Sequence, residues 1–270
     1  MTQLTNAQLL DELRALRPWH HDIQLTEDVS TGMAYAAGHD HEGDDSGEDE
    51  RGTVSLRSEY LRQLREIYPQ GLSGKRLIDC ACNAGGYCFW ARELDIEYAF
   101  GFDIREHWIK QARFVQSHRQ VFPTDRLEFA VQDLYKLPEL GLEPFDICIF
   151  KGIFYHLPDP ITGLKMAADL TRELLILNTQ TTWGLPDGYL KPGREDVEQL
   201  MSGAYGLNWR PTGPRVLAPV LKWLGFKHAR LVFYQQNPKV PELGRMSIFA
   251  ARKPGLLNHL SGIRFLFRNG

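Results

Sequence analysis

From residue 75 onward, short apolar runs alternate with longer amphipathic segments at a regular spacing. The apolar runs have the length of buried strands: KRLIDCA, EYAFGFD, LEFAVQD, FDICIFKG and ELLILNTQ. The segments between them have helical periodicity over residues 86–94, 105–120 and 159–172. Strands that alternate with helices of this length predict βαβ units with right-handed crossovers. We therefore expect an α/β fold with a Rossmann-like, doubly wound and mainly parallel sheet.

The sequence outside this alternation is less regular. Residues 6–16 and 58–69 have helical periodicity, and residues 38–51 contain seven acidic residues and nothing that can be buried, so we expect a flexible, solvated loop there. After residue 180 we expect a loop over 181–193, helices over 194–205 and 213–226, and an antiparallel C-terminal pair of strands, HARLVFYQQ and GRMSIFAARK. The first 70 residues, which include the helix at 6–16, form an N-terminal extension that we expect to include a lid.

Charge and composition exclude some classes of function. A net charge of −3 gives no global attraction to nucleic acid or to an anionic membrane. No apolar stretch reaches membrane-spanning length, and the first residues lack the pattern of a signal peptide, so we expect a cytoplasmic protein. The four cysteines lack zinc-site spacing and are expected to be reduced. Whether the protein requires a metal stays open from the sequence.

The segment DCACNAGGYCFW (79–90) joins the first predicted strand to the next helix, at the edge of the sheet where α/β proteins bind ligands. Asn83 tolerates the left-handed conformation, and Gly85 and Gly86 are unrestricted, while Ala81 and Ala84 are small. The segment therefore permits a close turn around a ligand, although it lacks the usual glycine spacing.

Acidic residues follow three of the predicted strands. Asp79 disfavours a phosphate but favours a ligand that carries an ammonium and a sulfonium. Asp103 is 24 residues further on, where an acid accepts both ribose hydroxyls of a nucleoside. At Asp133-Leu134 a carboxylate or amide can bind an adenine edge while Leu134 packs on its face. This pattern fits S-adenosylmethionine better than NAD or ATP.

Three stretches also resemble successive motifs of the class I S-adenosylmethionine-dependent methyltransferases. They are RLIDCACNAGGYCFWARELDIEYAFGFDIREHWIKQARF, FDICIFKGIFYHLPDPITGLK and GLNWRPTGPRVLAPVLKWLGF. The branch resembled contains the tRNA wobble-uridine carboxymethyl transferases and related uncharacterised methyltransferases; WHHDIQL (19–25) resembles an N-terminal element of the latter. The resemblance covers roughly residues 17–252. Ala81 stands where the family has glycine, and we expect its methyl group to fit only with ordinary backbone angles.

The resemblance implies positions for the cofactor and a division of the chain. The methionine part would be lined by Asp79, Cys82, Asn83, Ala84 and Gly85, with Lys151 offering its backbone; the ribose would be held by Asp103 and Ile104, and the adenine by Asp133 and Leu134. On this basis residues 1–70 are an N-terminal extension, 71–254 an S-adenosylmethionine-binding methyltransferase domain and 255–270 a tail.

Methyl transfer to a hydroxyl requires an aligned acceptor and a group that removes its proton. The segment KGIFYHL places Tyr155 and His156 beside the expected methyl position, and we predict His156 as the general base, with a purely structural histidine as the alternative. Tyr155 is the second residue that we predict at the catalytic position, where it shapes the pocket or hydrogen-bonds the substrate. Further candidates for contact with the acceptor are Trp19, His20 and His21 in a lid, and Trp183, Tyr189, Asn208 and Trp209 in a wall.

Three functions remain open from the sequence. The first is O-methylation of a hydroxyl on a sugar or other small polar metabolite, and the second is transfer of a methyl or carboxymethyl group to a tRNA wobble uridine. The third is a non-enzymatic cofactor-binding protein. Because the basic residues are spread along amphipathic helices and residues 38–51 are acidic, we expect a small-molecule acceptor, such as a saccharide, and no nucleic-acid partner. A homo-oligomer is compatible with the sequence.

Overall fold

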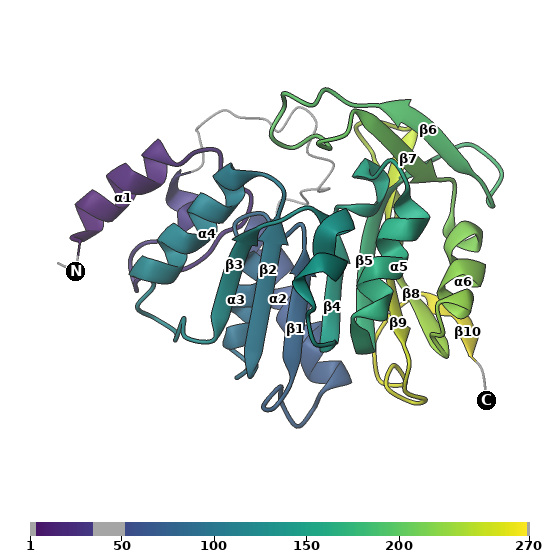
Figure 1. Cartoon of the computed structure of the whole chain (residues 1–270), viewed down its shortest axis with the longest axis horizontal. Helices are drawn as coiled ribbons and strands as arrows, with labels where there is room; N and C mark the ends of the chain where they lie inside the picture. Colours follow the sequence, from purple (N-terminus) through teal and green to yellow (C-terminus); the bar gives the residue numbers. More distant parts are fainter. Residues whose placement is uncertain (1–3, 35–51, 269–270) are drawn as a thin grey trace.

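The computed structural model describes residues 4–34 and 52–268, so the predicted acidic loop at 38–51 lies outside the described residues. One eight-stranded sheet forms the centre of the molecule, with the strand order β10-β8-β9-β5-β4-β1-β2-β3 (Figure 1). The strands are β1 Arg76–Cys80, β2 Tyr98–Asp103, β3 Leu127–Val131, β4 Phe145–Lys151, β5 Thr171–Thr182, β6 Leu190–Arg194, β7 Leu207–Pro211, β8 His228–Gln236, β9 Leu243–Ala251 and β10 Arg264–Arg268.

The helices lie between these strands in the predicted order. The α-helices are α1 Asn6–Ala15, α2 Gly52–Ile67, α3 Gly86–Arg92, α4 Glu106–His118, α5 Pro160–Asp169 and α6 Pro214–Trp223. The described residues also include the short 3₁₀ helices η1 Thr31–Ala34, η2 Leu134–Leu140 and η3 Phe154–His156.

The sheet has a parallel half and an antiparallel half. Strand β1 pairs in parallel with both β2 and β4, and β5 continues the parallel order beside β4. Strand β9 inserts antiparallel beside β5 and pairs with β8, which confirms the predicted C-terminal strand pair. The direction of strand order reverses between β1 and β4, so the carboxyl ends of these two strands form the crevice where a doubly wound sheet binds its ligand.

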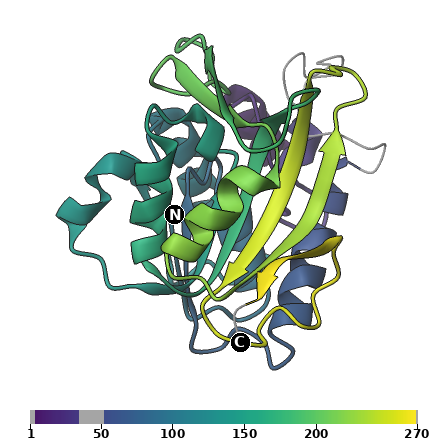
Figure 2. The same cartoon turned by 90° about the vertical axis from the view of Figure 1, so that its right-hand side faces the viewer.

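Alternate residues of β1 pack on opposite faces of the sheet. Leu77 belongs to a hydrophobic cluster with residues of α1 to α4, whereas Ile78 belongs to a cluster with η2, α5 and α6. Figure 2 shows helices on both sides of the sheet. A strand that is buried on both faces must be apolar along its whole length. Asp79, near the end of such a strand, is therefore the exception that marks a site.

Two expectations about the C-terminal half were wrong. Residues 194–205 are not a helix: Arg194 ends β6, which pairs antiparallel with β7, and the residues that follow form turns. The expected loop at 181–193 also contains the end of β5 and most of β6. The predicted tail contributes strand β10, which pairs antiparallel with β8 at the edge of the sheet. Hydrogen bonds to other segments, which leave no signal in local periodicity, decide both cases and also place β10.

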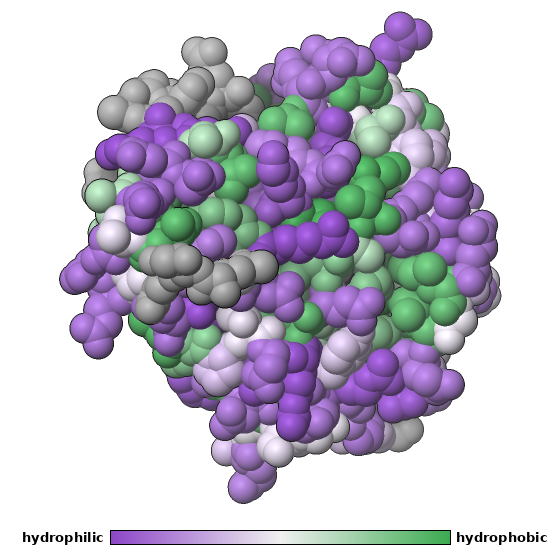
Figure 3. All heavy atoms as spheres, turned by 60° about the vertical axis from the view of Figure 1, so that its left-hand side comes forward, coloured by the Kyte–Doolittle hydropathy of each residue, from purple (hydrophilic) through white to green (hydrophobic). Residues whose placement is uncertain are grey.

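The first part of the N-terminal extension packs against α4, the helix that connects β2 to β3. Gln111 of α4 donates hydrogen bonds to the carbonyls of Leu16 and Pro18, at 2.7 and 2.6 Å. On the side of the molecule that contains α1, the surface is mainly hydrophilic, with hydrophobic side chains in separate patches (Figure 3). Among the described residues, no helix is long and apolar enough to cross a membrane.

Candidate cofactor and acceptor site

The turn after β1 is built from left-handed residues. Asn83 and Gly85 have φ of 51° and 79°, and Gly85 is the residue before the first turn of α3. A side chain at Gly85 would meet the Phe129 ring at 2.5 Å, so only glycine fits there. The Asn83 side chain closes the turn, because its Oδ1 accepts a hydrogen bond from the backbone N–H of Ala84 at 2.6 Å. The predicted close turn is therefore present.

Ala81 adopts the conformation that we expected it to avoid. Its φ is 59°, in the left-handed region, where a Cβ costs roughly 1–2 kcal/mol. The fold accepts this strain because the neighbouring backbone is fixed: the N–H of Cys82 donates to the carbonyl of Phe102 at 2.8 Å. The expectation that the methyl group fits only with ordinary backbone angles was wrong, and Ala81 lines the pocket beside Cys82 and Asn83.

Asp79 is a buried carboxyl group at the floor of this pocket. It is 1% exposed, and its Oδ2 has no hydrogen-bond partner among the described residues. Burial raises its pKa well above the ordinary value, and Asp103 adds to this rise, while the Lys151 ammonium opposes it. A buried carboxylate that lacks a partner is costly. A cationic group of a ligand placed against it would relieve that cost.

Asp103 ends β2 on the other side of the turn. Its two oxygens accept hydrogen bonds from the backbone N–H groups of Asn83 and Arg105, at 3.1 and 3.0 Å, and each keeps a free lone pair. Burial raises the pKa of Asp103 to about 6, against the two backbone hydrogen bonds and the nearby Arg105 and His156. Ile104 lines the pocket next to it. The carboxylate is positioned to accept hydrogen bonds from a diol.

The predicted adenine position is only partly as expected. Leu134 and Gln132 line the pocket, but Asp133 is not among the lining residues. Its carboxylate instead accepts hydrogen bonds from the backbone N–H of Tyr135 at 2.9 Å and from the Tyr205 hydroxyl at 2.6 Å. The Asp133 side chain therefore holds the end of β3 together rather than facing the pocket. Ala84 and Gly85 belong to the turn after β1 but do not line the pocket, so they support the turn from beneath.

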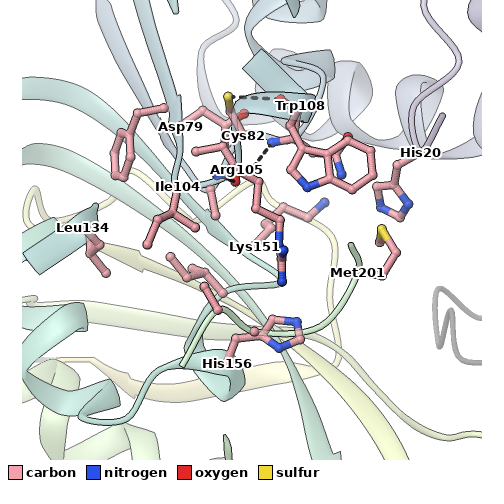
Figure 4. Close-up of a pocket in the computed structure, with 18 of the residues that line it drawn as sticks. His20, Asp79, Cys82, Ile104, Arg105, Trp108, Leu134, Lys151, His156 and Met201 are labelled. Atoms are coloured by element: carbon pink, nitrogen blue, oxygen red, sulfur yellow. Dashed lines mark hydrogen bonds between the residues drawn. The ribbon is translucent and has the colours of Figure 1, made fainter. Parts of the chain in front are cut away.

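A histidine and a glutamate form a pair beside the pocket, and Figure 4 shows the histidine, His156, on the side away from Asp79. The Nδ1 of His156, in η3 just after β4, lies 2.8 Å from both oxygens of Glu195. Burial alone would raise the pKa of Glu195, but the hydrogen bonds from His156 and from the backbone N–H of Gly203 hold it below the ordinary value. An ionised carboxylate only accepts, so Nδ1 carries a hydrogen, and the Nε2 of a neutral ring has a free lone pair.

Glu195 was missed from the sequence. It belongs to a segment that we expected to be helical, and nothing in its local pattern links it to a histidine 39 residues earlier. Glu195 does not itself line the pocket, but further residues of the same segment do: Leu200, Met201, Ser202, Gly203, Ala204 and Tyr205. Tyr155 lies where expected, 7% exposed, with its ring centroid 4.0 Å from that of His156.

The N-terminal histidines close the pocket from another side. His20 and His21 both line it, and the Nδ1 of His21 accepts a hydrogen bond from the backbone N–H of Gly86 at 3.3 Å. Burial lowers the pKa of His21 well below its ordinary value, and the nearby His20 and Lys151 lower it further. Lys151 lies at the end of β4, with its Nζ 4.2 Å from the centroid of the Tyr87 ring. His21 is therefore a neutral support of the turn.

The other aromatic candidates lie elsewhere. Trp19 is buried and donates through Nε1 to the carbonyl of Leu13 at 2.7 Å. Trp183 packs against Tyr234, and the Nε1 of Trp209 donates to the carbonyl of Pro158 at 3.0 Å. Tyr189 is exposed and Asn208 is buried, and neither lines the pocket. The wall predicted from the last four of these candidates is absent from the pocket. Asn178 of β5 and Arg245 of β9 line the pocket instead.

Comparison with known families identifies the domain that contains this pocket. Residues 72–193 match the model of a methyltransferase domain family. That range carries Asp79, Asp103, Lys151 and His156, and the sheet around it has the predicted topology. The chain contains a class I S-adenosylmethionine-dependent methyltransferase domain. The residues present fit the cofactor: Asp79 is a buried carboxyl group whose Oδ2 has no partner among the described residues, and the Asp103 carboxylate has free lone pairs.

Relatives of known name match this methyltransferase domain over part of their length. The chain is 26% identical over 178 residues to a tRNA U34 carboxymethyltransferase of Idiomarina loihiensis, covering 65% of this chain and 53% of the relative. It is 31% identical over 163 residues to the enzyme of the same name from Pseudomonas putida, covering 60% and 48%. The chain thus spans about half the length of the curated relatives it matches. These names give no support to our expectation that nucleic acid is not a partner.

A solved structure has a similar fold over nearly the whole chain. The N-terminal domain of EvdMO1, solved in the presence of SAH and D-fucose, superposes with a TM-score of 0.70, covering 93% of this chain and 98% of that one. The two sequences are 17% identical. The likeness extends beyond residues 72–193, so the N-terminal extension and the antiparallel half of the sheet belong to the same overall architecture.

Proposed function

We propose that the protein transfers a methyl group from S-adenosylmethionine to a hydroxyl of a sugar or another small polar metabolite, with His156 as the general base. The observation that carries this proposal is the His156–Glu195 pair, in which His156 lines the cofactor pocket and Glu195 lies behind it. A base of this kind serves an acceptor whose proton must leave as the new bond forms.

The pocket residues divide the work. When bound, the cofactor supplies a methyl group on a sulfonium, which is electrophilic without further activation. Asp79 would hold its cationic methionine part and Asp103 its ribose, with Leu134 against the adenine. Glu195 keeps the hydrogen of His156 on Nδ1, so Nε2 accepts the proton of the acceptor hydroxyl. Tyr155, whose ring contacts the imidazole at a tilt of 39°, limits where that hydroxyl can lie.

Two observations support a small polar acceptor. The end of the pocket at Asn178 and Arg245 offers both donors and an acceptor, which suits the hydroxyl groups of a saccharide. The fold neighbour that superposes over nearly the whole chain was solved in the presence of D-fucose.

The test is a transfer assay with a labelled methyl group against a cell extract separated into RNA and small-molecule fractions. We expect the label in the small-molecule fraction, and loss of turnover in His156→Ala by about 10²- to 10⁴-fold, the usual contribution of a general base. His259→Ala removes an exposed histidine and serves as the matched control. Unchanged turnover in His156→Ala would remove that residue as the base, and label in the RNA fraction would overturn the choice of acceptor.

The second candidate is transfer to a tRNA wobble uridine, which the names of the sequence relatives favour. A carboxymethyl group differs from a methyl group by a carboxylate, which needs a cation beside it. Arg245 lines the pocket, its Nε is buried without a partner among the described residues, and a terminal nitrogen donates to Asn178 Oδ1 at 3.4 Å. Sub-micromolar, salt-sensitive binding of tRNA in a shift assay would favour this candidate.

The third reading, a non-enzymatic cofactor-binding protein, has little support. Its only basis was Ala81, and the turn around Ala81 is intact. Calorimetry with S-adenosylhomocysteine tests the two enzymatic candidates against this reading. Absence of binding at high micromolar concentration would contradict both of them.

A further inference from the structure

The segment 195–205, which we call the lid segment, covers one side of the pocket without forming a helix or a strand. It is tied to the carboxyl ends of three parallel strands. Glu195 contacts His156 after β4, and Tyr205 donates to Asp133 after β3. The third tie is Arg105, the residue that directly precedes α4 after the end of β2.

Arg105 gathers the backbone of the lid segment around one atom. A single terminal nitrogen of its guanidinium lies 3.0 Å from the carbonyl oxygens of Val197, Gln199 and Ser202. A terminal guanidinium nitrogen has two hydrogens, so the three carbonyls share them. Hydrogen bonds from a charged donor are stronger than neutral ones. This arrangement fixes the turns of the lid segment in a way that local sequence preference does not.

Arg105 is also part of the proposed cofactor pocket. The backbone N–H of Arg105 donates to Asp103 Oδ1 at 3.0 Å, and its side chain lines the pocket. In Figure 4, Arg105 and Lys151 lie between Asp79 and His156, while Met201 of the lid segment lies beside His20. A ligand held by Asp79 and Asp103 would therefore lie beside the lid segment, and opening of the lid segment would widen the path by which that ligand exchanges.

We propose that Arg105 is a positioning residue that holds the lid segment closed, and that closure completes the His156–Glu195 pair. This proposal rests on the proposed function, in which His156 is the base. Glu195 is the first residue of the lid segment, and its carboxylate also accepts a hydrogen bond from Gly203 within that segment, at 2.9 Å. The position of the carboxylate thus depends on the turns that Arg105 fixes.

The first experiment measures the lid segment without any acceptor. Glu198 is exposed within it, so cleavage by a glutamate-specific protease reports how often the segment opens. We expect Arg105→Ala to be cleaved there at least about tenfold faster than the unaltered protein, as loss of one hydrogen bond to a charged group predicts. Arg105→Lys should restore part of the protection, since an ammonium still offers three donors. Lys110→Ala removes a nearby exposed cation of α4 and should cleave at the original rate.

The second experiment separates positioning from binding. In Arg105→Ala we expect kcat to fall by about 10- to 100-fold, as expected for a displaced catalytic group, while S-adenosylhomocysteine still binds and dissociates faster. Unchanged protease cleavage together with an unchanged dissociation rate would overturn the proposal, even if turnover were lost. If the unaltered protein fails to bind S-adenosylhomocysteine, the proposed function fails, whereas the protease result still decides whether Arg105 closes the lid segment.

Discussion

The raised pKa of Asp103 predicts that cofactor affinity depends on pH. The carboxyl group is almost fully buried and has a pKa of about 6. The hydroxyls of a ribose donate hydrogen bonds, so they bind the ionised form better than the protonated one. Binding should therefore lower the pKa of Asp103. The affinity for the cofactor should be highest well above pH 6 and should decrease as the pH falls through that value.

The size of the effect follows from the titration of one group. With a pKa of about 6, roughly one-tenth of Asp103 is ionised at pH 5 and almost all at pH 8, so the dissociation constant should rise about tenfold, or about 1.4 kcal/mol. Asp79, whose pKa is also raised by burial, has the same preference for its ionised form when it faces a cation, so it can only add to the slope.

Calorimetric titration with S-adenosylhomocysteine between pH 5 and 8 measures the dissociation constant directly. Asp103→Asn keeps the size of the side chain and removes its titration, so we expect weaker binding at pH 8 and the loss of the step near pH 6. Asp169→Asn, an exposed carboxylate of α5, should reproduce the original curve. A dissociation constant that is flat from pH 5 to 8, or an unchanged slope in Asp103→Asn, would refute the assignment of Asp103 to the ribose.

Three further substitutions test the turn and the pair at the wall. Ala81→Gly relieves a left-handed Cβ at a smaller entropic cost, so unfolding should cost about 0.5–1 kcal/mol more and the melting temperature should rise by about 1–3 °C; a fall would contradict the strain. Gly85→Ala drives a methyl group into Phe129 at a φ of 79°, and denaturant titration should show a loss of about 2–4 kcal/mol, whereas a neutral result would mean that the turn relaxes freely. Glu195→Gln should lower kcat by roughly 10²-fold with unchanged affinity for S-adenosylhomocysteine, and a kcat at the original level would separate Glu195 from the work of His156.

The sequence predicted the parallel half of the sheet because its inner strands, β1, β2, β4 and β5, are buried on both faces. Such strands are continuous apolar runs, and the amphipathic helices between them repeat at a fixed spacing. An acid that ends one of these runs, such as Asp79 or Asp103, must lie at the carboxyl edge of the sheet. The positions of these two residues in the pocket are therefore consequences of local pattern and topology.

The lid segment is the opposite case. Helical periodicity over 194–205 was outweighed by the pairing of β6 with β7 and by the guanidinium of Arg105, about 90 residues away in the chain. Tertiary hydrogen bonds to a charged group contribute more to stability than the intrinsic helix propensity of a segment of this length. The partner of His156 could not be predicted for the same reason.

By itself, the sequence determined the fold class, the order of the central strands and the acids at the ends of β1 and β2, because burial and periodicity act within single elements. Only the tertiary structure decided that Ala81 is left-handed, that Asp133 turns to Tyr205, and that Glu195 meets His156. Each of these depends on contacts between segments far apart in the chain. Such contacts leave no local signal, because they are fixed by the packing of complete elements.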